Sequence, residues 1–270
     1  MRKLINFLIM TFLMQQKFEK SYQVHVYETA PNARLSPYSL LNYLQDIASD
    51  HAEMLGFGRE DLMNKNSFWV LSRLYVEFKS WPGWNEKISL RTWPNGIDKI
   101  FALRNFEASY PDGGILGYAT SSWLILERST RKIQRPELLL EGLFVPEQEE
   151  FAIRNAAKLD AFVEQGLTNL CFRIKTSDLD INFHTNNAVY LRWISDSYDP
   201  GFLMKNDPES IEINYLAESK YDEEILIRTA AENDQCFNHS ILRKEDKKEL
   251  CRVRMVWRPL VNEKSKDIKQ

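Results

Sequence analysis

The sequence has few cysteines and histidines, and neither residue type forms a spaced pair. Its three cysteines, Cys171, Cys236 and Cys251, are an odd number with no close pair, which argues against a disulfide framework and a zinc knuckle. The four histidines are scattered, and no HExxH, EF-hand or paired CxxC motif is present. We therefore expect a reducing, cytoplasmic location and no metal site built by the protein.

Glycine-rich functional motifs are also missing. The ten glycines include no GxSxG elbow, which leaves an α/β-hydrolase serine without support. Neither a P-loop nor a GxGxxG motif occurs, and "GGILG" (Gly113 to Gly117) is typical of a turn. We expect no nucleotide cofactor, and no cofactor of any kind.

The chain lacks an excess of one charge and a long apolar run. Its formal net charge is −3, which predicts no general attraction to nucleic acid or to an anionic membrane. The apolar run from Leu4 to Met14 is too short to cross a bilayer, which needs about 20 residues. No small-residue cleavage site follows it. We expect residues 1–16 to be a disordered, dispensable leader, or the result of a start codon placed upstream of Met14, rather than a secretory signal or an anchor, and we expect no stable insertion into a membrane.

Periodicity predicts a strand, a long helix and then four strands in the first half. Ser21 to Ala30 alternates as a strand does, and Ser36-Pro37 is a helix start whose apolar face continues until Gly56. The turns between the following strands carry "WPGW", "PNG" and "PDGG", which are hairpin signals. The four runs rich in β-branched and aromatic residues are Phe68 to Ser80, Lys87 to Trp93, Ile100 to Tyr110 and Gly117 to Glu127.

The second half repeats this order. A strand (Leu167 to Thr176) and a helix (Asn186 to Asp199) precede four further strands, Ile211 to Ser219, Glu223 to Ala231, Cys236 to Arg243 and Glu249 to Trp257. A long helix wrapped by a bent antiparallel sheet is a hotdog. We predict an α+β fold of two tandem hotdog domains, residues 17–128 and 167–260, joined by a connector, 129–166, and followed by a tail, 261–270.

The stretch "SDLDINFHTNNAVYLRWISD" (Ser177 to Asp196) places Asp180, Asn182 and His184 at alternate positions before the second helix. In an extended segment these three side chains would share one face. N–H groups at the helix start would lie beside them and could donate to a carbonyl oxygen under attack. An acyl-transfer site is one interpretation. The other is a turn whose Asp and Asn satisfy backbone groups while His184 packs.

Most of the chain, from about Tyr22 to Trp257, resembles the acyl-acyl carrier protein thioesterases, a double-hotdog family of plant plastids and bacteria. The resemblance rests on "FWVLSRLYVEF" (Phe68 to Phe78), "ATSSWLILERSTRKIQRP" (Ala119 to Pro136), "SDLDINFHTNNAVYLRWISDS" (Ser177 to Ser197) and "IEINYLAES" (Ile211 to Ser219).

The resemblance implies that Asp180, Asn182, His184 and Glu218 are the catalytic residues. The chain departs from the family at Phe183 and Thr185, where glutamine and valine are usual, and at Ser219, where plant enzymes carry a cysteine. A thiol mechanism therefore has no support here, and pocket detail and substrate preference are in doubt.

The implied reaction is hydrolysis of acyl-acyl carrier protein, with Glu218 or Asp180 as general base or nucleophile, and a homodimer is compatible with it. The alternatives are an acyl-coenzyme A thioesterase of the same fold and a non-enzymatic acyl-binding sensor. The resemblance makes the first helix, with Leu41, Leu44 and Ala48, a candidate wall of an acyl tunnel. Two basic clusters are candidate docking sites for the acidic carrier protein: Arg128, Arg131, Lys132 and Arg135, and Arg243, Lys244, Lys247 and Lys248.

Overall fold

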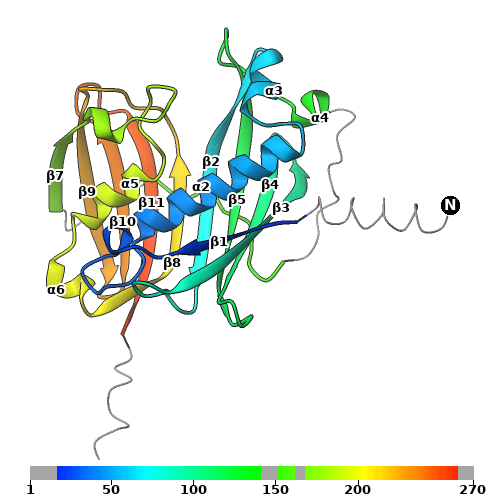
Figure 1. The fold of residues 1–270 in the computed structure, drawn as a ribbon. Coiled ribbons are helices and arrows are strands. Elements are labelled where there is room, and N and C mark those ends of the chain that lie inside the picture. The colour runs from blue at the N-terminus through cyan, green and yellow to red at the C-terminus, as the bar shows by residue number, and fades with distance from the viewer. Residues whose placement is uncertain (1–16, 141–150, 162–167, 261–270) are drawn as a thin grey trace, which may run out of the picture.

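A single antiparallel sheet forms the frame of the molecule (Figure 1). The computed structural model describes residues 17–140, 151–161 and 168–260, so the predicted leader and tail lie outside the described residues. In the first half the strands are β1 (Phe18–Gln23), β2 (Ser67–Phe78), β3 (Lys87–Asp98), β4 (Phe101–Ser109), β5 (Ile115–Glu127) and the short β6 (Ile133–Gln134). In the second half they are β7 (Thr168–Arg173), β8 (Asn206–Tyr215), β9 (Glu224–Asn233), β10 (Cys236–Arg243) and β11 (Glu249–Pro259).

The two halves of the sheet have the same internal order. The path runs β1-β3-β4-β5-β2 and continues as β8-β11-β10-β9-β7, with β6 paired to β5. The halves join where β2 pairs with β8, from Arg73 opposite Asn214 to Glu77 opposite Ser210. The predicted repeat of element order is therefore present, and the two copies share a continuous sheet and one buried core cluster.

Helix α2 (Pro37–Met54) lies across this sheet (Figure 1). Ser36 caps it by accepting the N–H of Ser39, and Pro37 occupies its first turn, as the sequence predicts. Leu40 and Ile47 are fully buried, and burying each side chain stabilises the fold by roughly 1.5–3 kcal/mol. The short helix α3 (Arg59–Asn64) follows.

The second helix is much shorter than predicted. Of the predicted helix over residues 186–199 the structure has only α5 (Val189–Ser195), and a separate helix, α6 (Pro200–Leu203), begins after the predicted end. The separate start of α6 has a local cause, because Asp199 caps it by accepting the N–H of Gly201 and Pro200 occupies its first position.

Two of the three predicted hairpin turns are wrong. "WPGW" (residues 81–84) does not connect paired strands, since β2 pairs with β5 and β8 whereas β3 pairs with β1 and β4. "PNG" (residues 94–96) lies inside β3 at a register shift, and the turn comes later, at Lys99, where φ is 58°. "PDGG" does form the hairpin between β4 and β5, with Gly113 at φ 90°.

Three predicted strands also end too late. Beyond β1 the chain forms a short 3-10 helix, η1 (Val26–Glu28), and a second one, η2 (Thr176–Asp178), follows β7. Strand β8 ends at Tyr215, so Glu218 and Ser219 lie in the segment after the strand rather than within it. A helix α4 (Pro136–Leu139) starts the connector.

Candidate active site

Asp180 to His184 forms a tight turn, not the extended segment that we predicted. The N–H of Asp180 donates to the carbonyl of His184 at 2.8 Å, and the N–H of Phe183 donates to the carbonyl of Asp180 at 3.0 Å. Phe183 has a φ of 60°, in the left-handed region, and its side chain points to solvent with 79% exposed. The three polar side chains therefore gather around a turn and do not line one face of a strand.

The Asp180 carboxylate holds the inside of this turn. Its Oδ1 accepts the backbone N–H of Asn182 at 2.8 Å and that of His184 at 3.3 Å. The Asn182 Nδ2 lies 3.5 Å from Asp180 Oδ2. This is the turn-stabilising role that the sequence left open as the alternative interpretation, and it applies to Asp180 but not to His184.

The first half contains a second copy of the turn without the acid and the imidazole. Residues 30–34 repeat the two backbone hydrogen bonds, from Ala30 N to Arg34 O at 2.8 Å and from Ala33 N to Ala30 O at 2.9 Å. Ala33 has a φ of 61°, matching Phe183. Ala30 has no carboxylate, so this backbone shape does not require one. The acid and the imidazole of the second copy are additions to a turn that the fold forms without them.

Backbone pairing between the turn and the segment after β8 places Glu218 beside His184. His184 and Lys220 form an isolated antiparallel β-bridge, and the N–H of Thr185 donates to the carbonyl of Ser219 at 3.0 Å. This pairing brings His184 Nε2 to 3.5 Å from Glu218 Oε2. Both side chains keep access to solvent, with 23% and 34% exposed. An imidazole beside a carboxylate can transfer protons to and from a substrate.

Arg131 completes this group, and sequence reasoning missed its role by assigning it only to a docking cluster. Its Nη2 donates to Glu218 Oε2 at 2.6 Å, and its guanidinium lies 4.9 Å from the centre of the Phe68 ring. Arg131 follows β5 in the first half, whereas Glu218 follows β8 in the second. The candidate site is therefore assembled from both halves of the chain, and no short sequence pattern could have shown that contact.

Ser219 faces away from this group. It is fully buried, and its hydroxyl lies 2.8 Å from the Tyr190 hydroxyl and 2.8 Å from Thr185 Oγ1. Burial raises the pKa of Tyr190 far above its ordinary value, so the phenol is neutral and cannot serve as a base for Ser219. The hydroxyl cluster is therefore structural.

The start of α5 does not offer the free donors that we predicted. The N–H of Ala188 donates to the Asn186 side chain at 2.9 Å, and the N–H of Val189 donates to the Asn186 carbonyl at 3.0 Å. Both donors are occupied within their own turn, so this expectation was wrong for these two groups. The Asn182 amide, which borders the cavity described next, is a side-chain donor for a substrate carbonyl.

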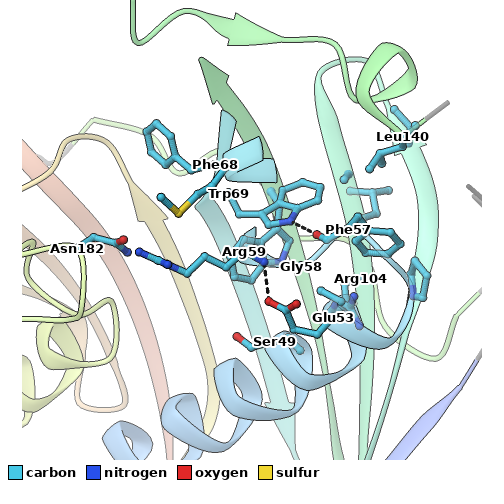
Figure 2. Close-up of a pocket in the computed structure, with 18 of the residues that line it drawn as sticks. Ser49, Glu53, Phe57, Gly58, Arg59, Phe68, Trp69, Arg104, Leu140 and Asn182 are labelled. Carbon is cyan, nitrogen blue, oxygen red and sulfur yellow. Dashed lines mark hydrogen bonds between the residues drawn. The ribbon is translucent and has the colours of Figure 1, made fainter. Parts of the chain in front are cut away.

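A cavity of about 270 Å³ lies beside the turn and extends into the first half (Figure 2). Asn182 and Ile181 border it on one side, and α2, α3 and strands β2 to β5 supply most of the remaining wall. Of the predicted wall residues, Ala48 lines the cavity, while Leu41 and Leu44 belong to the buried core instead. The lining is predominantly apolar, which suits a hydrocarbon chain.

The described residues give no donor set for a metal ion. No group of three or more His, Cys, Asp or Glu side chains is suitably placed within them. None of the helices that the structure describes combines the length and the apolar character needed to cross a membrane.

Two family models match the chain in sequence order. One, described as the acyl-ACP thioesterase N-terminal domain, matches residues 15–138, and the other, the acyl-ACP thioesterase C-terminal domain, matches residues 164–259.

Curated plant relatives show the same similarity. The chain is 25% identical over 236 residues to oleoyl-acyl carrier protein thioesterase, chloroplastic, of Coriandrum sativum. The matched region covers 81% of this chain and 63% of that protein. It is 27% identical over 264 residues to palmitoyl-acyl carrier protein thioesterase, chloroplastic, of Gossypium hirsutum. Here the matched region covers 90% of this chain and 64% of that protein. The chain thus spans less than two thirds of the length of these two relatives.

Solved structures show the same fold. An acyl-ACP thioesterase from Bacteroides thetaiotaomicron has a TM-score of 0.82 and 27% identity, with 90% of this chain and 98% of that chain covered. A 12:0-ACP thioesterase from Umbellularia californica has a TM-score of 0.80 and 20% identity, with 91% and 98% covered, and supports the fold alone. The predicted α+β fold of tandem hotdogs is confirmed. Because models of both domains of one family match most of the sequence in the expected order, the chain belongs to the acyl-ACP thioesterase family.

Proposed function

We propose that the chain hydrolyses the thioester between a fatty acyl group and acyl carrier protein and releases a free fatty acid. The observation that carries this proposal is the His184–Glu218 pair beside Asn182, which itself borders an apolar cavity. A thioester held at the turn would place its acyl chain in the cavity and its carbonyl near the pair. Family membership and the printed names of the relatives support the acyl carrier protein as the leaving partner.

Glu218 is the carboxylate that we assign to the attack. Asp180 Oδ1 already accepts the backbone N–H groups of Asn182 and His184, so we assign Asp180 to holding the shape of the turn. Glu218 lies against His184 and is open to solvent, where it can activate a water molecule. Arg131 keeps one of its oxygens fixed through a charge-assisted hydrogen bond.

The steps balance with water as the only co-reactant. The water proton passes to Glu218 as the water oxygen bonds to the carbonyl carbon, and the Asn182 amide donates to the carbonyl oxygen as negative charge develops there. When the tetrahedral intermediate collapses, the carbon–sulfur bond breaks, and His184 gives a proton to the departing thiolate as it takes the proton from Glu218 across the 3.5 Å contact, so both side chains return to their starting charge.

We also propose that the first basic cluster guides docking of the carrier protein. Arg128, Lys132 and Arg135 are exposed and adjoin Arg131, which contacts Glu218 directly. Within the described residues none of these three cations forms an ion pair, so their charge is available to an acidic partner. Replacing Arg128 and Lys132 by glutamate should raise KM for acyl carrier substrates and leave the rate on a small acyl thioester unchanged. An equal loss on both substrates would contradict a docking role.

The second basic cluster is a weaker candidate because its charge is partly neutralised. Arg243 pairs with Glu223 and Asp246, and Lys244 pairs with Glu224. These contacts belong to the β9–β10 part of the sheet and reduce the net positive field that a carrier protein would meet.

The test is to mix purified protein with an acyl-acyl carrier protein and titrate the freed thiol. We expect turnover that exceeds that on the matched acyl-coenzyme A. A strong preference for the coenzyme A substrate would replace the proposed function by that of an acyl-coenzyme A thioesterase. Saturable binding of the acyl group without turnover on either substrate would indicate an acyl-binding sensor.

Four further statements stay predictions: the domain limits at residues 17–128 and 167–260, a cytoplasmic location, the absence of stable membrane insertion, and a homodimer. Size-exclusion chromatography with light scattering tests the last of these.

A further inference from the structure

Arg104 is an unusual residue for the wall of a fatty acyl cavity. It lies on β4, only 6% of the residue is exposed, and it is part of the cavity lining. Figure 2 shows it beside helix α2, on the opposite side of the cavity from Asn182. An acyl chain that enters beside Asn182 would therefore extend toward a guanidinium group.

The known contacts of Arg104 use one of its nitrogen atoms. Its Nη1 donates to His51 Nδ1 at 3.0 Å and to Thr92 Oγ1 at 3.2 Å. Arginine cannot accept a hydrogen bond, so His51 Nδ1 is the acceptor in this contact. The remaining N–H groups, on Nη2 and Nε, donate to no other side chain or carbonyl of the described residues.

No carboxylate balances this charge within the part of the chain that the structure describes. Burial lowers the pKa of Arg104 to about 10, without an acidic neighbour acting on it, so the group is still protonated at neutral pH. Glu53 also lines the cavity, but its carboxylate accepts the backbone N–H of Arg59 at 2.7 Å and does not act on the pKa of Arg104. A buried guanidinium without a counter-charge is costly, and a ligand that supplies an oxygen would reduce that cost.

We propose that Arg104 binds an oxygen atom, of a hydroxyl or a carboxylate, at the end of the acyl chain remote from the thioester. This inference rests on the proposed function, because it names the class of acyl group that the same site takes. A plain hydrocarbon end would cover the free N–H groups of Arg104 without replacing their hydrogen bonds to water. An oxygenated end would form charge-assisted hydrogen bonds with them.

The experiment compares acyl carrier substrates of equal chain length that end in a methyl, a hydroxyl or a carboxyl group. A hydrogen bond to a charged group in a buried site supports a preference of about tenfold to a hundredfold in kcat/KM for an oxygenated end. The hydroxyl and carboxyl arms show whether the site takes the neutral or the anionic oxygen. Arg104→Met, similar in length but uncharged, should abolish the preference, and Arg104→Lys should keep part of it.

Two controls separate this effect from a loss of structure. Arg91→Met removes an exposed arginine that pairs with Glu19 and Glu107 on the sheet, and it should leave the preference unchanged. Should Arg104→Met fail to fold, the wild-type protein still decides the matter, since an oxygenated fatty acid should raise its melting temperature more than the plain acid of equal length.

The outcomes distinguish this inference from the proposed function. The role of Arg104 would be overturned if all three substrates were hydrolysed with the methyl-ended chain preferred and Arg104→Met did not change the ratio of their kcat/KM values. That outcome would leave the proposed thioesterase function intact. Absence of hydrolysis on every substrate would instead count against the proposed function. Without turnover, the melting-temperature comparison alone tests Arg104, and equal shifts for the plain and oxygenated acids would overturn its role.

Discussion

Replacing Ser219 by alanine should weaken the fold and leave the rate of each folded molecule nearly unchanged. Ser219 follows Glu218 directly, yet it is fully buried whereas the Glu218 side chain is 34% exposed. Its hydroxyl bonds to Tyr190 and Thr185, not to His184. The variant therefore separates a carboxylate mechanism from one in which the serine attacks.

The expected cost follows from these two contacts. Alanine removes both hydrogen bonds, each 2.8 Å long, and leaves the Tyr190 and Thr185 hydroxyls without that partner. A typical buried hydrogen bond contributes about 0.5–1.5 kcal/mol, so we expect a loss of about 1–3 kcal/mol in the free energy of unfolding. In a protein of this size each kcal/mol lowers the melting temperature by about 2–4 °C.

The assay combines urea unfolding, followed by circular dichroism, with initial rates of thiol release corrected for the folded fraction. Ser195→Ala is the matched control, because among the described residues the Ser195 hydroxyl bonds to the Leu191 carbonyl of its own helix and to no other group. A Ser219→Ala variant with wild-type stability and a loss of turnover of a hundredfold or more would refute this reasoning.

Three further predictions concern single side chains. His184→Ala should lower turnover by about a hundredfold or more, because it removes a positioned acid or base. Its melting temperature should stay within a few degrees of the wild type. The exposed His25→Ala is its control, and an active His184→Ala would make the imidazole structural. Arg131→Met should cost less than about 1 kcal/mol of stability, since both partners of its ion pair are a third or more exposed. It should still lower kcat/KM by about tenfold to a hundredfold, because the Glu218 carboxylate is then no longer held in position. Unchanged kinetics would show that the contact between Arg131 and Glu218 does not contribute to catalysis. Burial lowers the pKa of His239 to about 3, so below about pH 6.5 the unfolded chain takes up a proton that the folded chain refuses. Stability should therefore fall by about 2 kcal/mol between pH 6.5 and pH 5 in urea titrations, and His239→Gln should remove that part of the slope.

The long helix of the first half could be predicted from sequence because its ends are set locally. Ser36 caps it, Pro37 starts it, and Gly56 follows it with a φ of 75°. Its counterpart in the second half could not be predicted to the same accuracy, because no side-chain cap sets the start of α5 at Ala188, and the helix ends at Ser195, before the predicted end at Asp199.

The geometry of the candidate site lay beyond sequence patterns for two reasons. Phe183 adopts a left-handed conformation that its residue type disfavours, so alternation from Asp180 to His184 suggested a strand. The contact between Arg131 and Glu218 joins residues 87 positions apart, across the two halves. Only the resemblance to a family pointed to Glu218.

The same limit applies to the sheet. The "WPGW" turn has the composition of a hairpin, but Trp81 Nε1 donates to the carbonyl of Pro208 at 2.6 Å, in the second half of the chain. Pairing between the halves decides the path of this segment, and local turn chemistry carries no information about it.

The central claim is that Glu218 drives thioester hydrolysis, and single-turnover thiol release from one acyl-acyl carrier protein tests it most directly. Glu218→Gln keeps the size of the side chain and removes its charge, and Glu209→Gln, on the exposed face of β8, is the matched control. We expect the first variant to lose about two orders of magnitude or more in rate and the second to match the wild type. A folded Glu218→Gln that releases thiol at the wild-type rate would contradict the mechanism proposed for this site.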